Sequence, residues 1–169
     1  MLKGKDYKNQ PAGNVPVYAI GGVMENLGVA ESMGDRPCIA IGHTGTVGKP
    51  RIIEPPYFIT STQYYLLPKD GYPLYFVFAL LEAWVNWNQL IDPYNIRTTL
   101  NYEMFINIDF PDRTLQEREQ LAKDYKELLY RIEEEEKAIN YYKHYKDVML
   151  TGMFPEGNDD RNIKFDVLE

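Results

Sequence analysis

The sequence is poor in the side chains from which disulfides and metal sites are built. It holds one cysteine, Cys38, and two histidines, His43 and His144, which lie far apart in the chain. A single cysteine excludes an internal disulfide and leaves no ligand set for a cysteine-based zinc site. We therefore expect a protein of a reducing, cytoplasmic compartment that binds no metal.

Long hydrophobic runs are missing as well. The most apolar stretch, residues 74–85, contains Glu82 and is too short to cross a bilayer. No apolar segment follows the charged residues at positions 3–8, so no signal peptide is visible. Because 44% of the 169 residues are apolar and 14% are aromatic, the chain can bury a core. We expect a soluble globular protein without membrane contact.

Basic residues are in the minority, since the chain has 18 Lys and Arg against 25 Asp and Glu, a net charge of -7. Such a balance argues against a nucleic-acid partner, because phosphate contacts come from Lys and Arg. The charge is uneven, however. Residues 1–100 hold eight basic and eight acidic side chains, and residues 101–169 hold ten and seventeen. The first part is free to bind an anion, while the acidity of the second is typical of a solvated helix face.

The first part of the sequence is typical of a sheet. Short runs rich in β-branched and aromatic residues are separated by glycine and proline, a pattern that predicts strands and turns. These runs are residues 16–20, 37–41, 51–53, 57–60 and 63–67. Residues 73–90 are apolar nearly all round and predict a helix buried against the sheet. Residues 104–110 place Met, Ile, Ile and Phe at every second position and predict one more strand.

A long helix is predicted after Pro111. Thr114 and Glu117 have the spacing of a capping box, and Gly152 is suited to end the helix. At 1.5 Å per residue, residues 115–150 would extend roughly 54 Å. We therefore expect an α+β protein in three parts: a mixed-sheet globule over residues 1–111, a long helical region over 112–152 and a linker-like tail over 153–169.

One face of this helix carries an apolar seam. Positions 121, 125, 128, 132, 135, 139, 142, 146 and 149 follow alternating steps of four and three residues, and seven of the nine are apolar. The exceptions are Glu135 and Lys146. A seam with this spacing packs against another helix in a coiled coil. The candidate partner-binding residues are its apolar members, Leu121, Tyr125, Leu128, Ile132, Ile139, Tyr142 and Met149.

No catalytic motif is complete. Residues 41–50 resemble a phosphate-binding loop, but the second glycine comes one residue late and Pro50 stands where the magnesium-binding hydroxyl is required. Residues 54–57, Glu-Pro-Pro-Tyr, resemble a motif of DNA amino-methyltransferases, yet glutamate replaces the amide or short acid and no glycine-rich cofactor-binding strand accompanies it. Cys38 and His43 lack a third catalytic partner. We expect a chain that is not an enzyme and binds no cofactor.

The loop at residues 41–50 also offers hydrogen-bond donors to DNA. Gly42, Gly45 and Gly48 let the backbone approach a ligand closely, although Gly-Thr-Gly segments also make ordinary tight turns. Hydroxyl, imidazole and basic side chains around these glycines can donate to phosphate oxygens and base edges. The candidate DNA-binding residues are His43, Thr44, Thr46, Lys49, Arg51, Gln63 and Tyr64.

Several segments, in order over almost the whole chain, match one known pattern. Residues 42–50, GHTGTVGKP, resemble G-x-x-G-T-x-G-K-P, and residues 4–8 and 16–24, GKDYK and PVYAIGGVM, resemble GKDYK and PVYGTGGIM. Pro111 with Glu119 and Gln120 resembles the start of a conserved long helix. Residues 149–155 and 163–165, MLTGMFP and IKF, resemble LLQQMFP and IRF. The chain thus resembles a target-recognition domain with one helical region from the specificity subunit of type I restriction-modification systems.

This resemblance implies a division of labour that agrees with the uneven charge. The globule would read one half of a split target in double-stranded DNA. The long helices would form an antiparallel arm that spaces two recognition domains and binds two methyltransferase subunits, through which the restriction subunit joins. Catalysis and cofactors belong to those partners, so the chain itself would be a non-catalytic recognition subunit.

A complete specificity subunit has two recognition domains and two helical regions, whereas this chain has one of each. We expect either a half-subunit or a fragment, and we favour a homodimer whose two-fold axis pairs the long helices antiparallel. Two alternatives stay open. One is a protein-binding module dimerised by a coiled coil, which the acidic composition favours, and the other is a fragment of a DNA methyltransferase.

Overall fold

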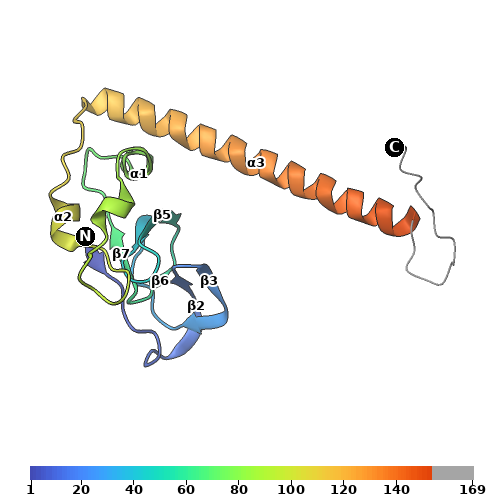
Figure 1. Cartoon of the computed structure of the whole chain (residues 1–169), viewed down its shortest axis with the longest axis horizontal. Coiled ribbons are helices and arrows are strands. Elements are labelled where there is room, and N and C mark those ends of the chain that lie inside the picture. The colour runs from blue at the N-terminus through green and yellow to red at the C-terminus, as the bar shows by residue number, and fades with distance from the viewer. Residues whose placement is uncertain (154–169) are drawn as a thin grey trace, which may run out of the picture. The chain divides into compact units, whose positions relative to one another are not determined.

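The fold is α+β, as predicted, in a computed structural model that describes residues 1–153 (Figure 1). Two small sheets and a short helical layer form the first part, and one long helix follows. The elements are β1 (Leu2–Lys3), β2 (Ala12–Ala19), β3 (Gly22–Val29), β4 (Cys38–Gly42), β5 (Gly48–Ile53), β6 (Phe58–Ile59), β7 (Gln63–Leu66), α1 (Leu74–Ala83), the 3₁₀ helix η1 (Trp87–Leu90), α2 (Tyr102–Ile106) and α3 (Leu115–Met153).

The larger sheet has the strand order β1-β7-β4-β5, and every neighbouring pair is antiparallel. Its strand β4, Cys-Ile-Ala-Ile-Gly, is buried along its whole length. A short apolar run without polar alternation is what a strand covered on both faces requires. Helix α1 contacts β4 and β5, and Cys38 and Ala40 of β4 belong to the core cluster that also contains Tyr57 and Ile59. This buried strand leads directly into the hairpin that carries the candidate DNA-binding residues.

The smaller sheet has the order β3-β2-β6 and is mixed, because β2 pairs antiparallel with β3 and parallel with β6. Val17, Val29 and Phe58 form its buried cluster. Phe58 and Ile59 are neighbours in β6, but Ile59 belongs to the other core cluster. Successive side chains of a strand point to opposite faces, so this two-residue strand joins the cores of both sheets.

The predicted helix at residues 73–90 is shorter in the structure. Helix α1 ends at Ala83, and η1 follows after Asn86, whose ψ of 89° is not helical. Val85 and Leu90 are both buried. The non-helical backbone of Asn86 divides the predicted helix into α1 and η1, and both pieces bury apolar side chains.

The prediction of a strand at residues 104–110 is wrong. The short helix α2 covers the start of this segment, and its cap is Asn101, whose side chain accepts a hydrogen bond from the backbone N–H of Met104 at 3.1 Å. That bond satisfies one of the free donors of a first helical turn. The residue that is buried is Phe105, whereas Met104 and Ile106, which the alternation predicted to face the core, are exposed. The cap and the burial of Phe105 outweigh the period-two pattern.

The predicted long helix is confirmed. The capping box forms, since the Thr114 N–H donates to the Glu117 carboxylate at 2.8 Å and the Glu117 N–H donates to the Thr114 hydroxyl at 3.3 Å. Hydrogen bonds from Thr114 to the ionised carboxylate hold the pKa of Glu117 below its ordinary range. Helix α3 continues through Gly152 to Met153, so Gly152 does not end it as predicted.

The first turns of α3 pack against the sheet-bearing part of the chain. The Arg118 guanidinium lies over the Tyr72 ring, 4.0 Å from its centroid, and donates to the Gly71 carbonyl at 3.0 Å. It also forms an ion pair with Asp112 at 2.5 Å. Ala122, one turn further along, is buried. These contacts place the start of α3 in the same folded unit as the sheets.

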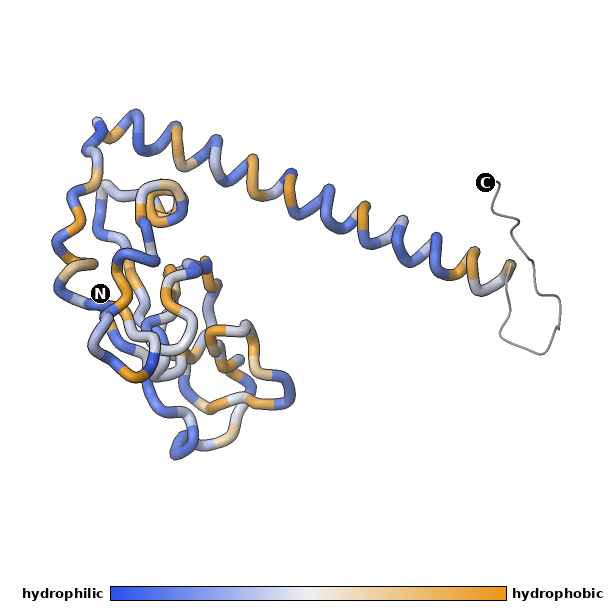
Figure 2. The backbone as a smooth tube through the Cα atoms, in the orientation of Figure 1, coloured by the Kyte–Doolittle hydropathy of each residue, from blue (hydrophilic) through white to orange (hydrophobic). Residues whose placement is uncertain are grey.

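The chain divides into two compact units, Met1–Glu127 and Leu128–Glu169, of which the second is described only as far as Met153. This boundary lies inside α3, whereas the composition of the sequence placed a boundary after residue 111. Figure 2 shows apolar residues recurring at successive turns along α3. The predicted linker-like tail lies outside the described residues, apart from Met153 itself.

Candidate nucleic-acid interface

The candidate DNA-binding residues surround the hairpin that joins β4 and β5. Gly42 and Gly48 pair across its base. A Cβ atom on Gly42 would lie 2.1 Å from the Thr46 carbonyl oxygen, and one on Gly48 would lie 2.5 Å from the Trp87 ring. Gly45, with φ of +89°, has nothing within 4 Å of such an atom. Gly42 is therefore required by the hairpin itself and Gly48 by the Trp87 ring, while Gly45 has free space around its α-carbon and a φ that favours glycine.

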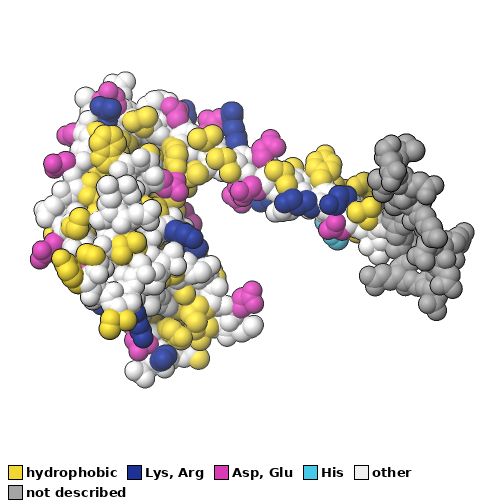
Figure 3. Space-filling view, in the orientation of Figure 1, with side chains coloured by type: hydrophobic (Ala, Val, Ile, Leu, Met, Phe, Trp, Pro, Cys, Tyr) yellow, Lys and Arg dark blue, Asp and Glu magenta, His cyan; other side chains and the backbone are white. Residues whose placement is uncertain are grey.

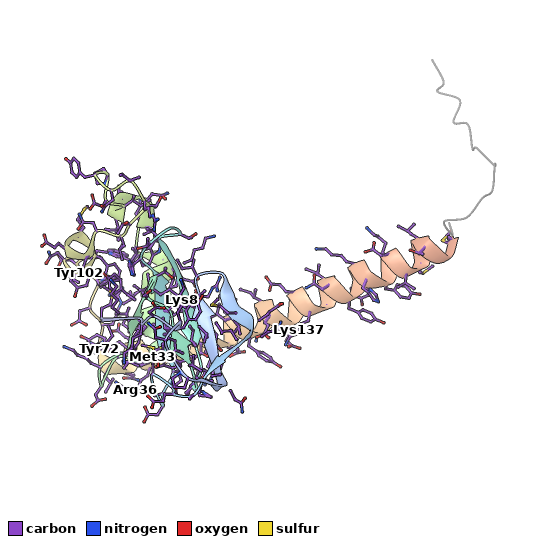
Figure 4. The ribbon with its side chains drawn as sticks, turned by 90° about the horizontal axis from the view of Figure 1, so that it is seen from below. Lys8, Met33, Arg36, Tyr72, Tyr102 and Lys137 are labelled. Atoms are coloured by element: carbon purple, nitrogen blue, oxygen red, sulfur yellow. The ribbon has the colours of Figure 1, made fainter. Side chains whose placement is uncertain are left out.

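His43 lies at the inner side of this hairpin and is only 8% exposed. Its Nε2 lies 2.7 Å from the Ser61 carbonyl oxygen and its Nδ1 lies 2.7 Å from the Thr44 hydroxyl oxygen. A carbonyl oxygen only accepts, so Nε2 carries a proton and donates it. The Tyr64 ring lies 4.4 Å from the imidazole, centroid to centroid, and 5.7 Å from the Tyr102 ring of α2, which Figure 4 labels. The structure thus brings three of the predicted residues together as an internal support of the hairpin.

Gln63 is likewise interior, with 3% of its surface exposed. Its side-chain Nε2 donates to the Tyr18 carbonyl oxygen of β2 at 2.8 Å. This bond ties strand β7 of the larger sheet to the smaller sheet. In this position the Gln63 amide supports the fold and is not presented at the surface for a base edge.

Thr46 and Lys49 are the exposed candidates, and Arg51 is half-buried. Lys49 has φ of +50°, in the left-handed region, where a residue with a Cβ atom costs about 1–2 kcal/mol. It follows Gly48 at an irregularity in the β4–β5 pairing, and such bulges redirect side chains. The Arg51 guanidinium extends toward Gly22, since a Cβ on that glycine would lie 3.5 Å from Arg51 Nη1. The accessible cationic groups therefore come from β5.

A second segment, which the sequence analysis overlooked, is attached to the hairpin. The Gly45 N–H donates to the Thr98 carbonyl at 2.7 Å, and the Leu100 N–H donates to the His43 carbonyl at 2.8 Å. These bonds hold the turn of residues 92–97 beside the hairpin. The available signal was Asp-Pro-Tyr-Asn, a turn sequence, with Tyr94 and Ile96 belonging to no periodic pattern.

The candidate seam residues of α3 fall into two groups. Tyr125 is used within the folded unit: its ring centroid lies 6.2 Å from that of Phe78, and its hydroxyl donates to the Glu82 carboxylate. Burial and the bond to Glu82 raise the Tyr125 pKa to about 12. The other candidates are between 45% and 67% exposed: Leu121, Leu128, Ile132, Ile139, Tyr142 and Met149. On the face shown in Figure 3, hydrophobic side chains lie along the length of α3.

The side chains that the sequence offered for metal binding or catalysis have the following surroundings. No group of three or more His, Cys, Asp and Glu in that range is placed to hold a metal ion. Burial raises the pKa of the Cys38 thiol to about 11, which keeps it protonated and a poor nucleophile. Tyr57, the aromatic residue of the Glu-Pro-Pro-Tyr segment, is fully buried and its hydroxyl donates to the Arg36 carbonyl at 3.2 Å. It is not available to stack on an extruded base.

Comparison with protein-family models gives no match, and comparison with curated proteins gives none either. Within the described part of the chain, the helices are too short or too polar to pass through a lipid bilayer.

Proposed function

We propose that this chain is a non-catalytic DNA-recognition subunit of a cytoplasmic type I restriction-modification complex. It reads one half of a split target with its folded unit and binds partner helices and methyltransferase subunits with α3. The observation that carries the proposal is the apolar seam of α3, where Leu128, Ile132, Ile139 and Tyr142 are all exposed. Side chains at coiled-coil spacing that the described residues leave exposed are what a helical arm for assembly requires.

The polar surface of α3 supports the same assignment. Lys137 forms ion pairs with Glu133 and Glu134 at 2.9 Å each, and these pairs raise its pKa. Lys137 lies at the heptad position opposite the seam and is labelled in Figure 4. At the level of Lys137, the face turned away from the seam is therefore charged, while the seam beside it presents Ile132 and Ile139 to a partner. We propose that the first partner is a second copy in antiparallel orientation, and that methyltransferase subunits, followed by the restriction subunit, assemble on the paired helices.

The hairpin supports the DNA-reading half of the proposal. Thr46 and Lys49 are exposed near Gly45, which has free space around its α-carbon, and Arg51 lies two residues beyond Lys49 in β5. Hydroxyl, ammonium and guanidinium groups are the donors that contact phosphates and bases. The strained backbone of Lys49 places a cation at the hairpin at a cost to the fold, as functional positions commonly do.

The DNA half is tested by measuring affinity as a function of salt. The chain is combined with its methyltransferase subunit and a duplex that the complex selects from a random-sequence pool. Lys49→Ala should weaken binding to all sequences and reduce the salt slope by about one, because one phosphate contact is lost. Lys69→Ala is the matched control, since Lys69 is an exposed lysine in the loop before α1, beside Tyr72 and Glu119. A complex that selects no sequence would reject DNA reading and favour the protein-binding alternative.

The assembly half is tested by analytical ultracentrifugation. Leu128→Glu and Ile132→Glu should each dissociate the dimer, because each places an unpaired charge in the seam. Tyr130→Glu is the control: Tyr130 is 61% exposed but lies at the heptad position opposite the seam. A dimer that survives both seam substitutions, or that is lost equally in the control, would contradict the proposed interface.

A further inference from the structure

The turn at residues 92–97 is a preformed projection. The Asp92 N–H donates to the Thr99 carbonyl at 2.8 Å, and Ile91 and Leu100 form a bridge at the base of the turn. Inside the turn, the Asp92 carboxylate accepts from the Tyr94 N–H at 3.0 Å and from the Asn95 side chain at 2.8 Å. The backbone is thereby fixed without help from the side chains of Tyr94 and Ile96.

Those two side chains are the most exposed large hydrophobic groups in the described chain. Tyr94 is 95% exposed and Ile96 is 106% exposed, whereas the seam tyrosine Tyr142 reaches 67%. A folded protein gains nothing from holding two apolar side chains fully in water on an ordered turn. Their exposure indicates a surface that is covered when a partner binds.

The surroundings of the turn favour DNA as that partner. The hairpin and the turn, residues 43–51 and 91–101, contain three basic side chains, Lys49, Arg51 and Arg97, and one acidic side chain, Asp92. The combined charge is therefore +2 on a chain whose total is -7. Both carboxylate oxygens of Asp92 accept hydrogen bonds within the turn, so this carboxylate is engaged by the turn itself.

The size of the turn favours DNA as well. A groove of double-stranded DNA is roughly 6–12 Å wide and admits a narrow projection. Apolar side chains enter such grooves to contact thymine methyl groups or to wedge between base steps.

We infer that the turn of residues 92–97 is a second DNA-contacting element, which enters a groove beside the hairpin and places Tyr94 and Ile96 against the bases. Arg97 contacts the adjacent phosphate backbone. The inference rests on the proposed DNA-reading function. The hydrogen bond from Gly45 to Thr98 sets the distance between the two elements, so hairpin and turn reach the duplex as one unit.

The test compares Tyr94→Ser/Ile96→Ser, Arg97→Gln and a control, Ile106→Ser, an exposed apolar residue at the end of α2. Each variant is assembled with the methyltransferase subunit and titrated with the duplex that the wild-type complex selects. The double variant should lose about tenfold or more in affinity with an unchanged salt slope, because apolar contacts release no counterions. Arg97→Gln should reduce the slope by about one. Tyr94→Phe/Ile96→Val should restore most of the affinity, and thermal unfolding should show that all variants are folded.

Wild-type affinity and selectivity in the double variant would overturn the inference while leaving the proposed function intact. A double variant that no longer assembles with the methyltransferase subunit would assign the turn to a protein contact and would also overturn it. If the wild-type complex selects no duplex at all, the proposed function and the inference both fail.

Discussion

Among the described residues, buried tyrosines occur in the first unit of the chain and not in the second. In Met1–Glu127, Tyr57 is fully buried and Tyr65 is 7% exposed, and burial raises the pKa of both hydroxyls. In α3 beyond Glu127, four tyrosines are between 54% and 67% exposed: Tyr130, Tyr141, Tyr142 and Tyr145. Stability of the first unit therefore comes from apolar groups that its own chain covers. The described part of the second unit carries apolar groups that stay exposed, and mutation can separate the two cases.

The sharpest comparison pairs two isoleucines. Ile59 is fully buried, so Ile59→Ala should lower the free energy of unfolding by about 2–5 kcal/mol in denaturant titrations. Ile139 is 51% exposed, and at concentrations where the chain is monomeric Ile139→Ala should change it by less than about 0.5 kcal/mol. An equal loss of unfolding free energy at both positions in the monomer would show that the chain itself also covers Ile139. A loss at Ile139 that grows with protein concentration would show that association covers it.

Arg118 tests where the folded unit ends. Arg118→Ala removes the contact with the Tyr72 ring and the hydrogen bond to Gly71, and should lower the free energy of unfolding by about 1–2 kcal/mol. Arg113→Ala, at an exposed neighbouring arginine, should have little effect on the same measurement. If neither substitution lowers the free energy of unfolding, the first turns of α3 do not contribute to the stability of the sheet-bearing unit.

Lys49 tests whether the folded unit contains a residue whose backbone conformation lowers its stability. Lys49→Gly relieves the left-handed backbone, so the free energy of unfolding should stay unchanged or rise by up to about 1 kcal/mol. DNA affinity should fall as in Lys49→Ala. A clear loss of stability in thermal unfolding would show that the Lys49 side chain has a packing role.

The smallest effect expected is a pH dependence from the helix cap. The pKa of Glu117 is lowered in the folded chain by hydrogen bonds from Thr114. Its contribution is therefore complete above the ordinary glutamate pKa, about 4.3, and is lost as the pH falls through the lowered value. Glu117→Gln should reduce the acid sensitivity of α3 measured by circular dichroism between pH 5 and 2. The same acid sensitivity in the variant would assign it to another carboxyl, such as Asp112, whose pKa is lowered by Arg118.

Elements whose signal lies within a few neighbouring residues were predicted well from the sequence. The apolar run of β4 and the box formed by Thr114 and Glu117 need no distant partner to be recognised. Strand β3 was missed because Gly28 and Asn26, the latter with φ of +58°, weaken its pattern. The position of α2 also depended on tertiary packing, through the burial of Phe105.

The candidate interface shows the same limit. Gln63 and His43 have the side chains of DNA-reading residues, but their donors are bound to the carbonyl groups of Tyr18 and Ser61. Sequence alone does not reveal whether a polar side chain already has an internal partner. It also gave no periodic signal for the turn of residues 92–97, because a single projecting turn has no period.

The anchors of that turn have a consequence for how recognition could change. The bonds at Gly45, Asp92 and Leu100 join backbone atoms, so they do not depend on which side chains the tip carries. Tip residues such as Tyr94, Ile96 and Arg97 are open to replacement while the scaffold stays in place. If the turn contacts DNA as we infer, replacing these tip residues between the fixed backbone anchors should alter target preference without loss of the fold.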